Sequence, residues 1–355
     1  MAYSVVIDGY NGTKQGSRKS EGKVMTKAGT GVHQQLGSLK VGDNFSGVYY
    51  LETSHVRKTV NGKDFTDLAL RDKSGKRMAK FWGVVPGLKN GGYVFVAGKV
   101  DEYMGAPSFV LANAENADEP ADKADYQPVY ADIDSLADRL DVLRVNLKDA
   151  CKVAKMEIVG EVVESVYANG AFFNKLMSVP GSIAPHYGCA GGLLANIVRS
   201  CEVSIKLAET YKLDTTEAVL VQGGAMLAII GGVDAYGFQD CIPVVTTNGT
   251  LLGVSGLTMI RVATAAKRVA AERAKTVKDP ADGPAVARLL HIVSSALATE
   301  TERVQPMTKE AMVVFNALRM DRELVSAIDV IANDQNPEQE FTAYDPTTQR
   351  RYFRG

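Results

Sequence analysis

Residues 38–113 carry aromatic and cationic side chains in close alternation. Aromatic faces stack on nucleobases and Lys or Arg side chains neutralise phosphates, so this combination of residue types can hold a single-stranded nucleic acid. The residues that we expect to make such contacts are Tyr49, Arg57, Lys58, Lys63, Phe65, Arg71, Lys76, Arg77, Lys80, Trp82 and Tyr103. The alternative is that about half of the aromatic residues fill the interior of a folded domain. Phe81 and Trp82 are neighbours and point to opposite faces of a strand, so at most one of them belongs to that interior.

The same segment has the pattern of β-strands joined by tight turns. Apolar and polar residues alternate, and hairpin turns are expected at Asn61-Gly62, Lys73-Ser74-Gly75 and Met104-Gly105. Five strands within about 75 residues predict a small β-barrel of the OB type. Such a barrel would set the aromatic residues in a basic groove that follows the phosphates of a strand.

Composition divides the rest of the chain. The predicted parts are a flexible basic arm (1–37, with one short strand at Tyr3–Ile7), an OB-fold domain (38–114), an acidic Pro/Ala-rich linker (115–133), a helical domain (134–335) and a basic-aromatic tail (336–355). The helical period is clearest where Leu136, Leu140, Leu143 and Leu147 fall on one face. The expected fold class is a multidomain α+β protein, an N-terminal OB-fold β-barrel followed by an all-α helical domain.

The formal charge is unevenly distributed although the chain as a whole carries only −1. Residues 1–111 hold 16 Lys and Arg against 9 Asp and Glu, whereas the remainder holds 24 against 32. A basic front half suggests a polyanionic partner, and an acidic back half argues against a molecule that binds nucleic acid over its whole surface.

Few residues of the back half could perform metal or nucleophilic chemistry. The cysteines Cys151, Cys189, Cys201 and Cys241 have apolar neighbours and no CxxC spacing, as expected of free thiols in a reducing cytoplasm. No Ser-His-Asp spacing and no phosphate loop followed by Lys-Ser/Thr is visible. No apolar run of about 18 residues and no charged-then-apolar leader is present, so neither a membrane span nor a signal peptide is expected. The expected location is the cytoplasm, that of a host cell if the protein is viral.

Nine motifs occur in a fixed order between about residue 38 and residue 353. Those of the front half are KVGD, the NGK hairpin, LALRDKSG and AKFW. Those of the back half are FFNKLMSVPGSIAPHYGCAGGLLANIVRS, GAMLAIIGGVDAY, TTNGTLLGVSGL, LLHIVSSALA and PMTKEAMVVFNALRMD. In order and spacing they resemble the YhaM-type 3′-to-5′ exoribonucleases, which join an N-terminal OB domain to a C-terminal HD domain. The resemblance covers nearly the whole chain and implies an HD-like helical domain.

The chemistry that the resemblance implies does not carry over to this chain. An HD phosphohydrolase holds one or two divalent ions with His and Asp side chains from several helices. The positions that match those ligands are occupied by Asn196, Ala228, Ile229, Val254, Ala296, Leu297 and Leu318, and Gly232 replaces a lysine. Of a tandem His-His pair only His186 remains, followed by Tyr187, and His291 is expected to serve packing rather than ligation. We therefore expect no metal, no cofactor and no catalysis, with the former metal cavity filled as hydrophobic core.

The function expected from these patterns is non-catalytic, sequence-nonspecific binding of single-stranded nucleic acid, with DNA favoured over RNA. The degenerate HD domain would be a scaffold for a homo-oligomer, in which several barrels gain avidity along one strand. Such a protein suits phage transcription or replication, with an RNA or DNA polymerase as a further partner; large phages of the N4 group direct their RNA polymerase with a single-stranded-DNA-binding cofactor. Two alternatives are a metal-dependent 3′-to-5′ exonuclease with a site displaced to His186, Asp234 and Asp240, and an adaptor that recruits a polymerase. The tail residues Arg350, Arg351, Tyr352, Phe353 and Arg354 are expected to contact either phosphates or a neighbouring subunit.

Overall fold

The computed structural model describes residues 33–103, 106–123, 125–184, 186–276, 282–298, 304–334, 339–345 and 348–354. The strand predicted at Tyr3–Ile7 and the turn predicted at Met104-Gly105 lie outside these residues.

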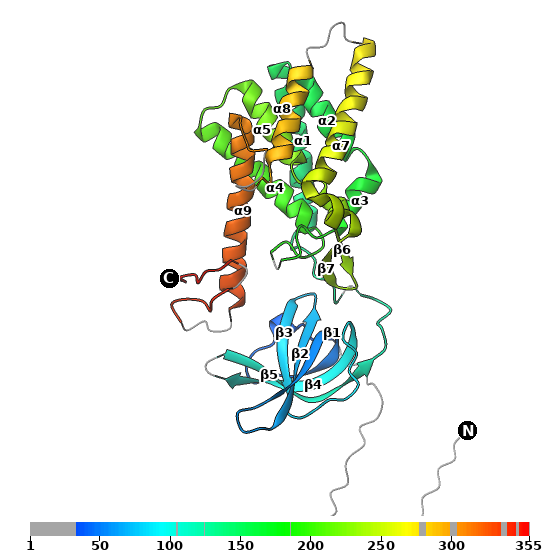
Figure 1. Cartoon of the computed structure of the whole chain (residues 1–355), viewed down its shortest axis with the longest axis vertical. Helices are drawn as coiled ribbons and strands as arrows, with labels where there is room; N and C mark the ends of the chain where they lie inside the picture. Colours follow the sequence, from blue (N-terminus) through cyan, green and yellow to red (C-terminus); the bar gives the residue numbers. More distant parts are fainter. Residues whose placement is uncertain are drawn as a thin grey trace, which may run out of the picture. The chain divides into compact units, whose positions relative to one another are not determined.

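Five strands near the N-terminus close into a barrel (Figure 1). They are β1 (Asn44–Lys58), β2 (Asp64–Asp72), β3 (Gly75–Phe81), β4 (Gly92–Tyr103) and β5 (Ala106–Ala117). Their order around the barrel is β1-β2-β3-β5-β4, and β4 pairs back onto β1. All pairs are antiparallel except β3 with β5. A closed five-stranded barrel with this crossed order is of the OB type, so the predicted N-terminal barrel is confirmed.

Alternation along the strands separates the barrel core from its outer surface. On β2, Thr66, Leu68 and Leu70 are buried, whereas Phe65 and Asp67 between and beside them are half-buried. The inner positions of all five strands form one apolar cluster, and each fully buried aliphatic side chain there contributes roughly 1.5–3 kcal/mol of hydrophobic stabilisation. The outward positions are thereby left for other contacts.

The predicted turns are found where the structure describes them. Gly62 has a φ of +75° and donates its amide to Thr59 O, which makes the β1–β2 connection a tight hairpin with glycine in the left-handed region. Asp72 pairs with Gly75 across the β2–β3 turn, so Lys73 and Ser74 form the connection.

The residues just before β1 also belong to the barrel. A short 3₁₀ helix spans Leu36–Ser38, and Leu36 is buried in the barrel core. His33 Nδ1 lies 3.0 Å from Val48 O. Residues 33–37, which the sequence assigned to the flexible arm, therefore pack on the barrel; the other predicted boundaries stay predictions.

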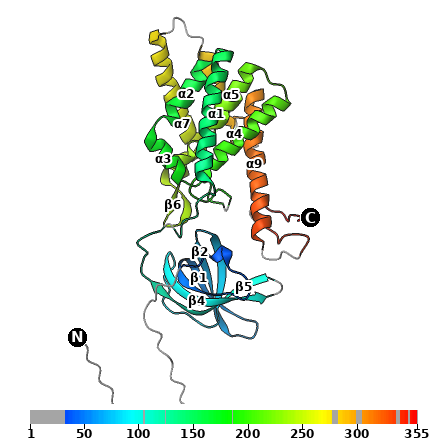
Figure 2. The same ribbon diagram turned by 180° about the vertical axis from the view of Figure 1, so that it is seen from behind.

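The described remainder is largely helical (Figures 1 and 2). The helices are α1 (Ile133–Ala154), α2 (Glu157–Tyr167), α3 (Gly170–Ser178), α4 (Gly192–Thr210), α5 (Thr215–Leu227), α6 (Gly232–Ala235), α7 (Thr247–Thr276), α8 (Gly283–Ser295) and α9 (Lys309–Asn333). The four leucines predicted to share one face of α1 are all buried, as expected. The pair β6 (Tyr236–Gln239) and β7 (Ile242–Val245) corrects the expectation that this domain is purely helical.

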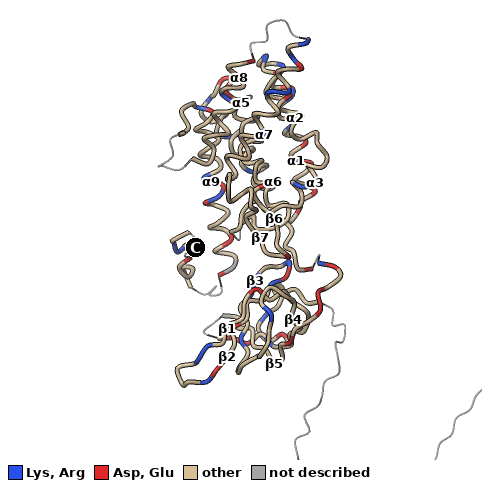
Figure 3. Tube along the Cα trace, turned by 45° about the vertical axis from the view of Figure 1, so that its right-hand side comes forward, with Lys and Arg blue, Asp and Glu red and all other residues tan. Residues whose placement is uncertain are grey.

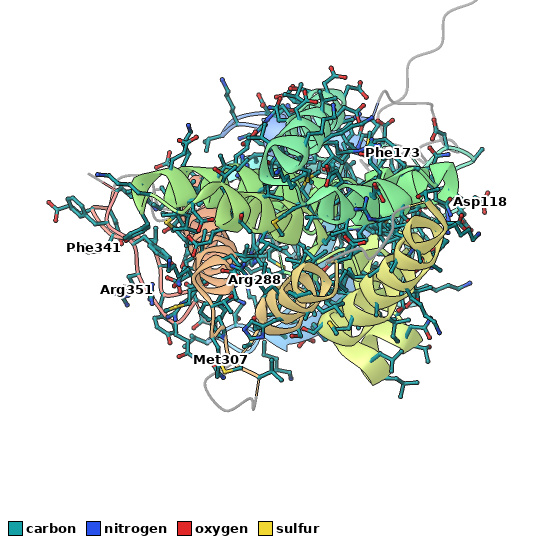
Figure 4. The ribbon with its side chains drawn as sticks, turned by 90° about the horizontal axis from the view of Figure 1, so that it is seen from above. Asp118, Phe173, Arg288, Met307, Phe341 and Arg351 are labelled. Carbon is teal, nitrogen blue, oxygen red and sulfur yellow. The ribbon has the colours of Figure 1, made fainter. Side chains whose placement is uncertain are left out.

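Helix α5 is the core element of the helical domain. It contacts α1, α2, α4, α8 and α9, and its residues from Val219 to Leu227 are buried. It begins at a capping box in which the Asp214 carboxylate accepts the Glu217 amide and Glu217 accepts the Asp214 amide. Around this core, Arg288 of α8 donates to Glu310 of α9 at 2.7 Å, and Figure 4 shows Arg288 where these two helices meet.

Two helical stretches are long and apolar enough to cross a membrane by length and composition alone. The first, Thr215–Ala235, is 89% buried within the protein and is the core helix just described. The second, Thr247–Thr276, is 22% buried and is kinked at Gly253, whose φ is +65°. Two such helices are weak support for a membrane protein, because core helices pass the same test.

Candidate nucleic-acid interface

Three of the predicted stacking residues meet on the outer surface of the barrel. Phe65 of β2 and Trp82, which directly follows β3, have ring centroids 5.9 Å apart at an interplanar angle of 48°. Lys80 Nζ lies 6.0 Å from the centroid of Phe65 and 5.5 Å from that of Tyr103 at the end of β4. Trp82 is 60% exposed and Tyr103 61% exposed, so both rings offer a face to solvent. We call Phe65, Lys80, Trp82 and Tyr103 the aromatic cluster.

The strand register explains why these side chains meet. Thr66 of β2 is paired with Phe81 of β3, so the adjacent residues Phe65 and Trp82 lie opposite each other. On the other side of this pair, Asp67 is paired with Lys80. Phe81 packs against the barrel core while Trp82 points outward, as the alternation required. The buried Thr66 hydroxyl donates to Gly83 O at 2.8 Å and fixes the chain directly after Trp82.

Cations surround the aromatic cluster on the β1–β2 hairpin. Arg57 is paired in register with Phe65, and its Nε lies 3.1 Å from Asp67 Oδ2. Lys58 Nζ lies 3.9 Å from Asp64 Oδ1, and both side chains are exposed. Lys63 follows the hairpin turn and is exposed; within the described residues neither Lys63 nor Lys80 has a carboxylate partner. Figure 3 shows the Lys and Arg positions of this hairpin in blue.

The other predicted cations lie at the far end of the β2–β3 hairpin. Arg71 is six residues from Phe65 along β2, a separation of about 20 Å in an extended strand. Arg71 Nε donates to Glu52 Oε1, and Lys76 Nζ lies 2.7 Å from Glu52 Oε2. Arg77 donates to Lys76 O and has no carboxylate partner among the described residues. The predicted residues therefore form two groups rather than one.

Glu52 decides how much of that second group is available to a ligand. Its side chain is only 11% exposed, and burial alone would raise its pKa; the bonds from Lys76 and Arg71 outweigh burial and hold that pKa below its usual value. Glu52 is thus a carboxylate that binds both cations and cancels one of their two charges. Arg71, 18% exposed, is committed to it, and this counter-charge was not anticipated from the sequence.

Tyr49 is not part of the interface, which corrects the prediction. Its side chain is fully buried in the barrel core, where its hydroxyl donates to Gln34 O at 2.7 Å. Its ring packs edge-on against Phe45 at a centroid distance of 6.3 Å. Burial raises the pKa of its phenol well above the usual value. Tyr49 therefore has no face to offer to a base.

Two outward residues of the same surface were missed by the sequence prediction. Met78 of β3 is 46% exposed and lies between Lys76 and Lys80 in the outward alternation. His55 of β1 is exposed and paired in register with Asp67. The alternation itself carried the signal for both residues.

Comparison with known proteins yields a limited likeness. No family model matches the chain, and no curated protein matches it. Among solved structures, the second OB-fold domain of replication protein A from Methanococcus maripaludis is 14% identical, with a TM-score of 0.21, covering 25% of this chain and 98% of that one. A replication protein A heterotrimer bound to single-stranded DNA is also 14% identical, with a TM-score of 0.19, covering 24% of this chain and 64% of that one. Likeness at this level identifies neither a family nor a ligand, and the barrel type rests on its strand order.

In the helical domain, the positions that the resemblance assigned to metal ligands lie in or against hydrophobic core. Ala228, Ile229, Ala296 and Leu318 all belong to the core cluster, and Val254 and Leu297 pack against it. Asn196 is half-buried and accepts the Ser200 hydroxyl at 3.0 Å. Among the described residues, no group of three or more His, Cys, Asp or Glu side chains could hold a metal ion.

The remaining polar residues of that region are held in local contacts. His186 Nδ1 lies 3.0 Å from Ser326 Oγ, and burial lowers the pKa of this histidine. His291 Nε2 accepts the Met307 amide at 3.0 Å. Asp234 is bound by Lys175 at 3.0 Å and by Arg261. Burial would raise the pKa of Asp234, but these cations hold it below its usual value.

Proposed function

We propose that the chain binds single-stranded nucleic acid, with the strand lying across the aromatic cluster of the barrel. The observation that carries this proposal is the exposure of Trp82 and Tyr103 in one cluster, in which Trp82 lies beside Phe65 and Lys80 lies between Phe65 and Tyr103. Rings of this kind stack on bases, and the adjacent ammonium group can meet a phosphate. The face formed by strands 2 and 3, with the loops that join strands 1–2 and 4–5, is the surface with which OB barrels bind oligonucleotides.

Stacking explains why the proposed binding is sequence-nonspecific, because every base has a π-face. Phosphate contacts would come first from Lys63 and Lys80, which have no carboxylate partner among the described residues, and then from Arg57 and Lys58. We propose single-stranded DNA as the preferred ligand and RNA as the weaker one. Two replication protein A structures share the barrel type but add no weight at their TM-scores.

We also propose that the helical domain is a non-catalytic, HD-like scaffold. The apolar residues at the positions matched to ligands support this proposal, because alanine, isoleucine and leucine cannot coordinate a cation. A strand-binding protein with such a scaffold suits phage transcription or replication in a host cytoplasm, with a polymerase as partner.

Substitution of Trp82 tests the strand-binding proposal. Trp82→Ala should weaken the affinity for a fluorescein-labelled oligo-dT by about 5- to 150-fold, the equivalent of the roughly 1–3 kcal/mol that one stacked base contributes. Trp82→Phe retains a ring and should lose far less. Fluorescence anisotropy against oligo-dT, the matching RNA and duplex DNA measures all three affinities. Trp82 is the only tryptophan, so quenching of its emission by the strand gives an independent readout.

A matched pair of lysines provides the control. Lys80→Ala removes the ammonium group between Phe65 and Tyr103, whereas Lys99→Ala removes one that is 53% exposed and bound to Asp101. Lys80→Ala should weaken binding and Lys99→Ala should not. Equal affinities of the wild type, Trp82→Ala and Lys80→Ala would refute the proposed interface.

The competing activity is metal-dependent shortening of a strand. End-labelled single strands incubated with Mn²⁺ or Mg²⁺ should stay intact, and metal analysis of the purified protein should find no bound ion. Shortening that the wild type performs and His186→Ala loses would overturn the non-catalytic proposal.

A further inference from the structure

Helix α9 carries an apolar stripe on its solvent-facing side. The stripe consists of Met312, Met320, Leu324, Ile328 and Ile331, whose exposed fractions lie between 37% and 60%. The opposite side of the helix, with Val314, Leu318 and Val325, is buried in the helical domain. At about 100° per residue the stripe occupies one side of the helix, a sector of about 160°, over about 29 Å of its length. Contiguous apolar surface of this length is typical of an interaction site.

The stripe borders a groove of about 1020 Å³. Leu207 and Tyr211 line it from the end of α4 and the residue that follows, and Tyr352 lines it from the tail. Tyr211 is 71% exposed, so the groove has an apolar wall that faces solvent. Figures 1 and 2 both show α9 at the edge of the helical domain.

Four charged residues line this groove: Lys309, Arg319, Glu323 and Arg350. Lys309 is already paired with Glu217, and the pair that indicates the occupant is Arg319 with Glu323. These two side chains are 56% and 46% exposed and lie one turn apart, with Arg319 Nε 3.1 Å from Glu323 Oε1. Two opposite charges one turn apart on a helix can pair with the same two charges of a second copy when the two helices run antiparallel. The two-fold axis then crosses the helix pair midway between Arg319 and Glu323. In that arrangement Arg319 of each copy meets Glu323 of the other, and Met312 comes close to the other copy's Ile331.

We propose that the chain forms a two-fold symmetric homodimer through this face, with α9 packed antiparallel against α9 of a second copy. A two-fold interface is isologous, so one self-complementary patch suffices to form it and closes at two subunits. The interface buries the apolar stripe in its centre and keeps the charged pairs at its rim. It rests on the helical domain alone and does not depend on strand binding.

The mass of the full-length protein in solution tests the dimer. Light scattering after gel filtration should give twice the 38.1 kDa of the chain. Met320→Glu with Leu324→Glu places charges at the interface centre and should weaken dimerisation by at least about 30-fold, as expected of central interface residues. Val142→Glu is the matched control, because Val142 is 58% exposed on α1 and outside the stripe. It should leave the mass unchanged, and circular dichroism checks that all variants fold.

Charge reversal tests the proposed axis. Arg319→Glu leaves each copy with acidic side chains at both positions 319 and 323, and Glu323→Arg leaves each copy with basic side chains at both positions. Each variant alone should dissociate, whereas an equimolar mixture should form a heterodimer. A monomeric wild type, a dimer that survives Met320→Glu with Leu324→Glu, or a mixture that stays monomeric would each overturn the proposal.

Discussion

Asp72 holds two separate segments of the barrel together through one buried carboxylate. It is fully buried, accepts the Leu36 amide at 2.6 Å and the Ser74 amide at 2.8 Å, and lies 3.4 Å from His33 Nε2. The segment before β1 is thereby tied to the β2–β3 turn. Burial alone would raise the pKa of Asp72, but the nearby His33 side chain and the hydrogen bonds from Ser74 and the Leu36 amide outweigh burial and lower it.

Asp72→Asn should destabilise the protein by about 3 kcal/mol at neutral pH, because donors aimed at a carboxylate lose their charged acceptor. A depressed folded-state pKa contributes stability above the unfolded-state value of about 3.9, and that stability is lost as the pH falls through the folded value. The difference in the free energy of unfolding between wild type and variant should therefore shrink below about pH 4. Urea unfolding at several pH values measures this free energy.

The control for this variant is Asp101→Asn. Asp101 is 47% exposed and bound to Lys99, so its removal should change the free energy of unfolding by less than about 1 kcal/mol. The free energy of unfolding that Asp72→Asn loses relative to the wild type should depend on pH. If this loss stayed constant from pH 7 to below about pH 4, it would contradict the role given to the ionised carboxylate.

At single residues, the sequence predicted which types of side chain could contact a strand but not which of them the fold leaves exposed and unpaired. Trp82 is exposed as expected, because its neighbour Phe81 is the one that packs on the core. Tyr49 is buried and Arg71 is bound to Glu52. Alternation separates two faces of a strand without saying which is inside. The Glu52–Arg71 contact depends on a register shift between Leu51 and Thr53, which no local pattern reveals.

Among the elements, α5 shows how glycine permits close helix packing. A Cβ added to Gly223 would lie 2.5 Å from Val159 Cγ1 of α2, and one added to Gly224 would lie 2.6 Å from Ile292 Cγ2 of α8. Real Cβ atoms do not approach so closely. Both neighbours are β-branched and therefore stiff at χ1, so neither can move aside easily.

Gly224→Ala should destabilise the protein by about 1–2 kcal/mol, because overpacking outweighs the roughly 1 kcal/mol gained in helix propensity. Gly256→Ala in α7 should instead stabilise the protein, because its added Cβ would lie 3.6 Å from Leu252 Cβ, an ordinary contact. The midpoint temperatures of thermal unfolding of both variants and of the wild type measure these changes. Stabilisation by Gly224→Ala would mean that α5 and α8 are less tightly packed than described.

The elements were predictable where the signal is local. The leucine period predicted α1, and Asn61-Gly62 predicted the first hairpin. The β6–β7 pair was missed because its strands have only four residues each and interrupt a long helical pattern. The parallel contact of β3 with β5, which closes the barrel, joins residues about 30 apart and leaves no trace in the alternation.

For the whole molecule, the distribution of charge predicts how binding depends on salt. Seven cations were expected to contact phosphates, but within the described residues only Lys63, Arg77 and Lys80 have no carboxylate partner. Each neutralised phosphate of a single strand contributes about −0.7 to the slope of log K against log salt. Arg77 lies at the far end of the β2–β3 hairpin, so Lys63 and Lys80 are those of the three that lie on the side of the aromatic cluster. Two contacts give a slope of about −1.4, whereas seven would give one near −5.

Anisotropy titrations of an oligo-dT of about ten nucleotides, short enough for one barrel, should therefore show a slope of about −1.4. Lys80→Ala should make the slope shallower by about 0.7. Arg71→Ala should leave the slope unchanged, because Arg71 already neutralises Glu52. A slope near −5 would mean that the strand breaks the Glu52 ion pairs and runs the full length of the β2–β3 hairpin. A slope near zero would remove phosphate contacts from the binding mode altogether, because no counterions would then be released.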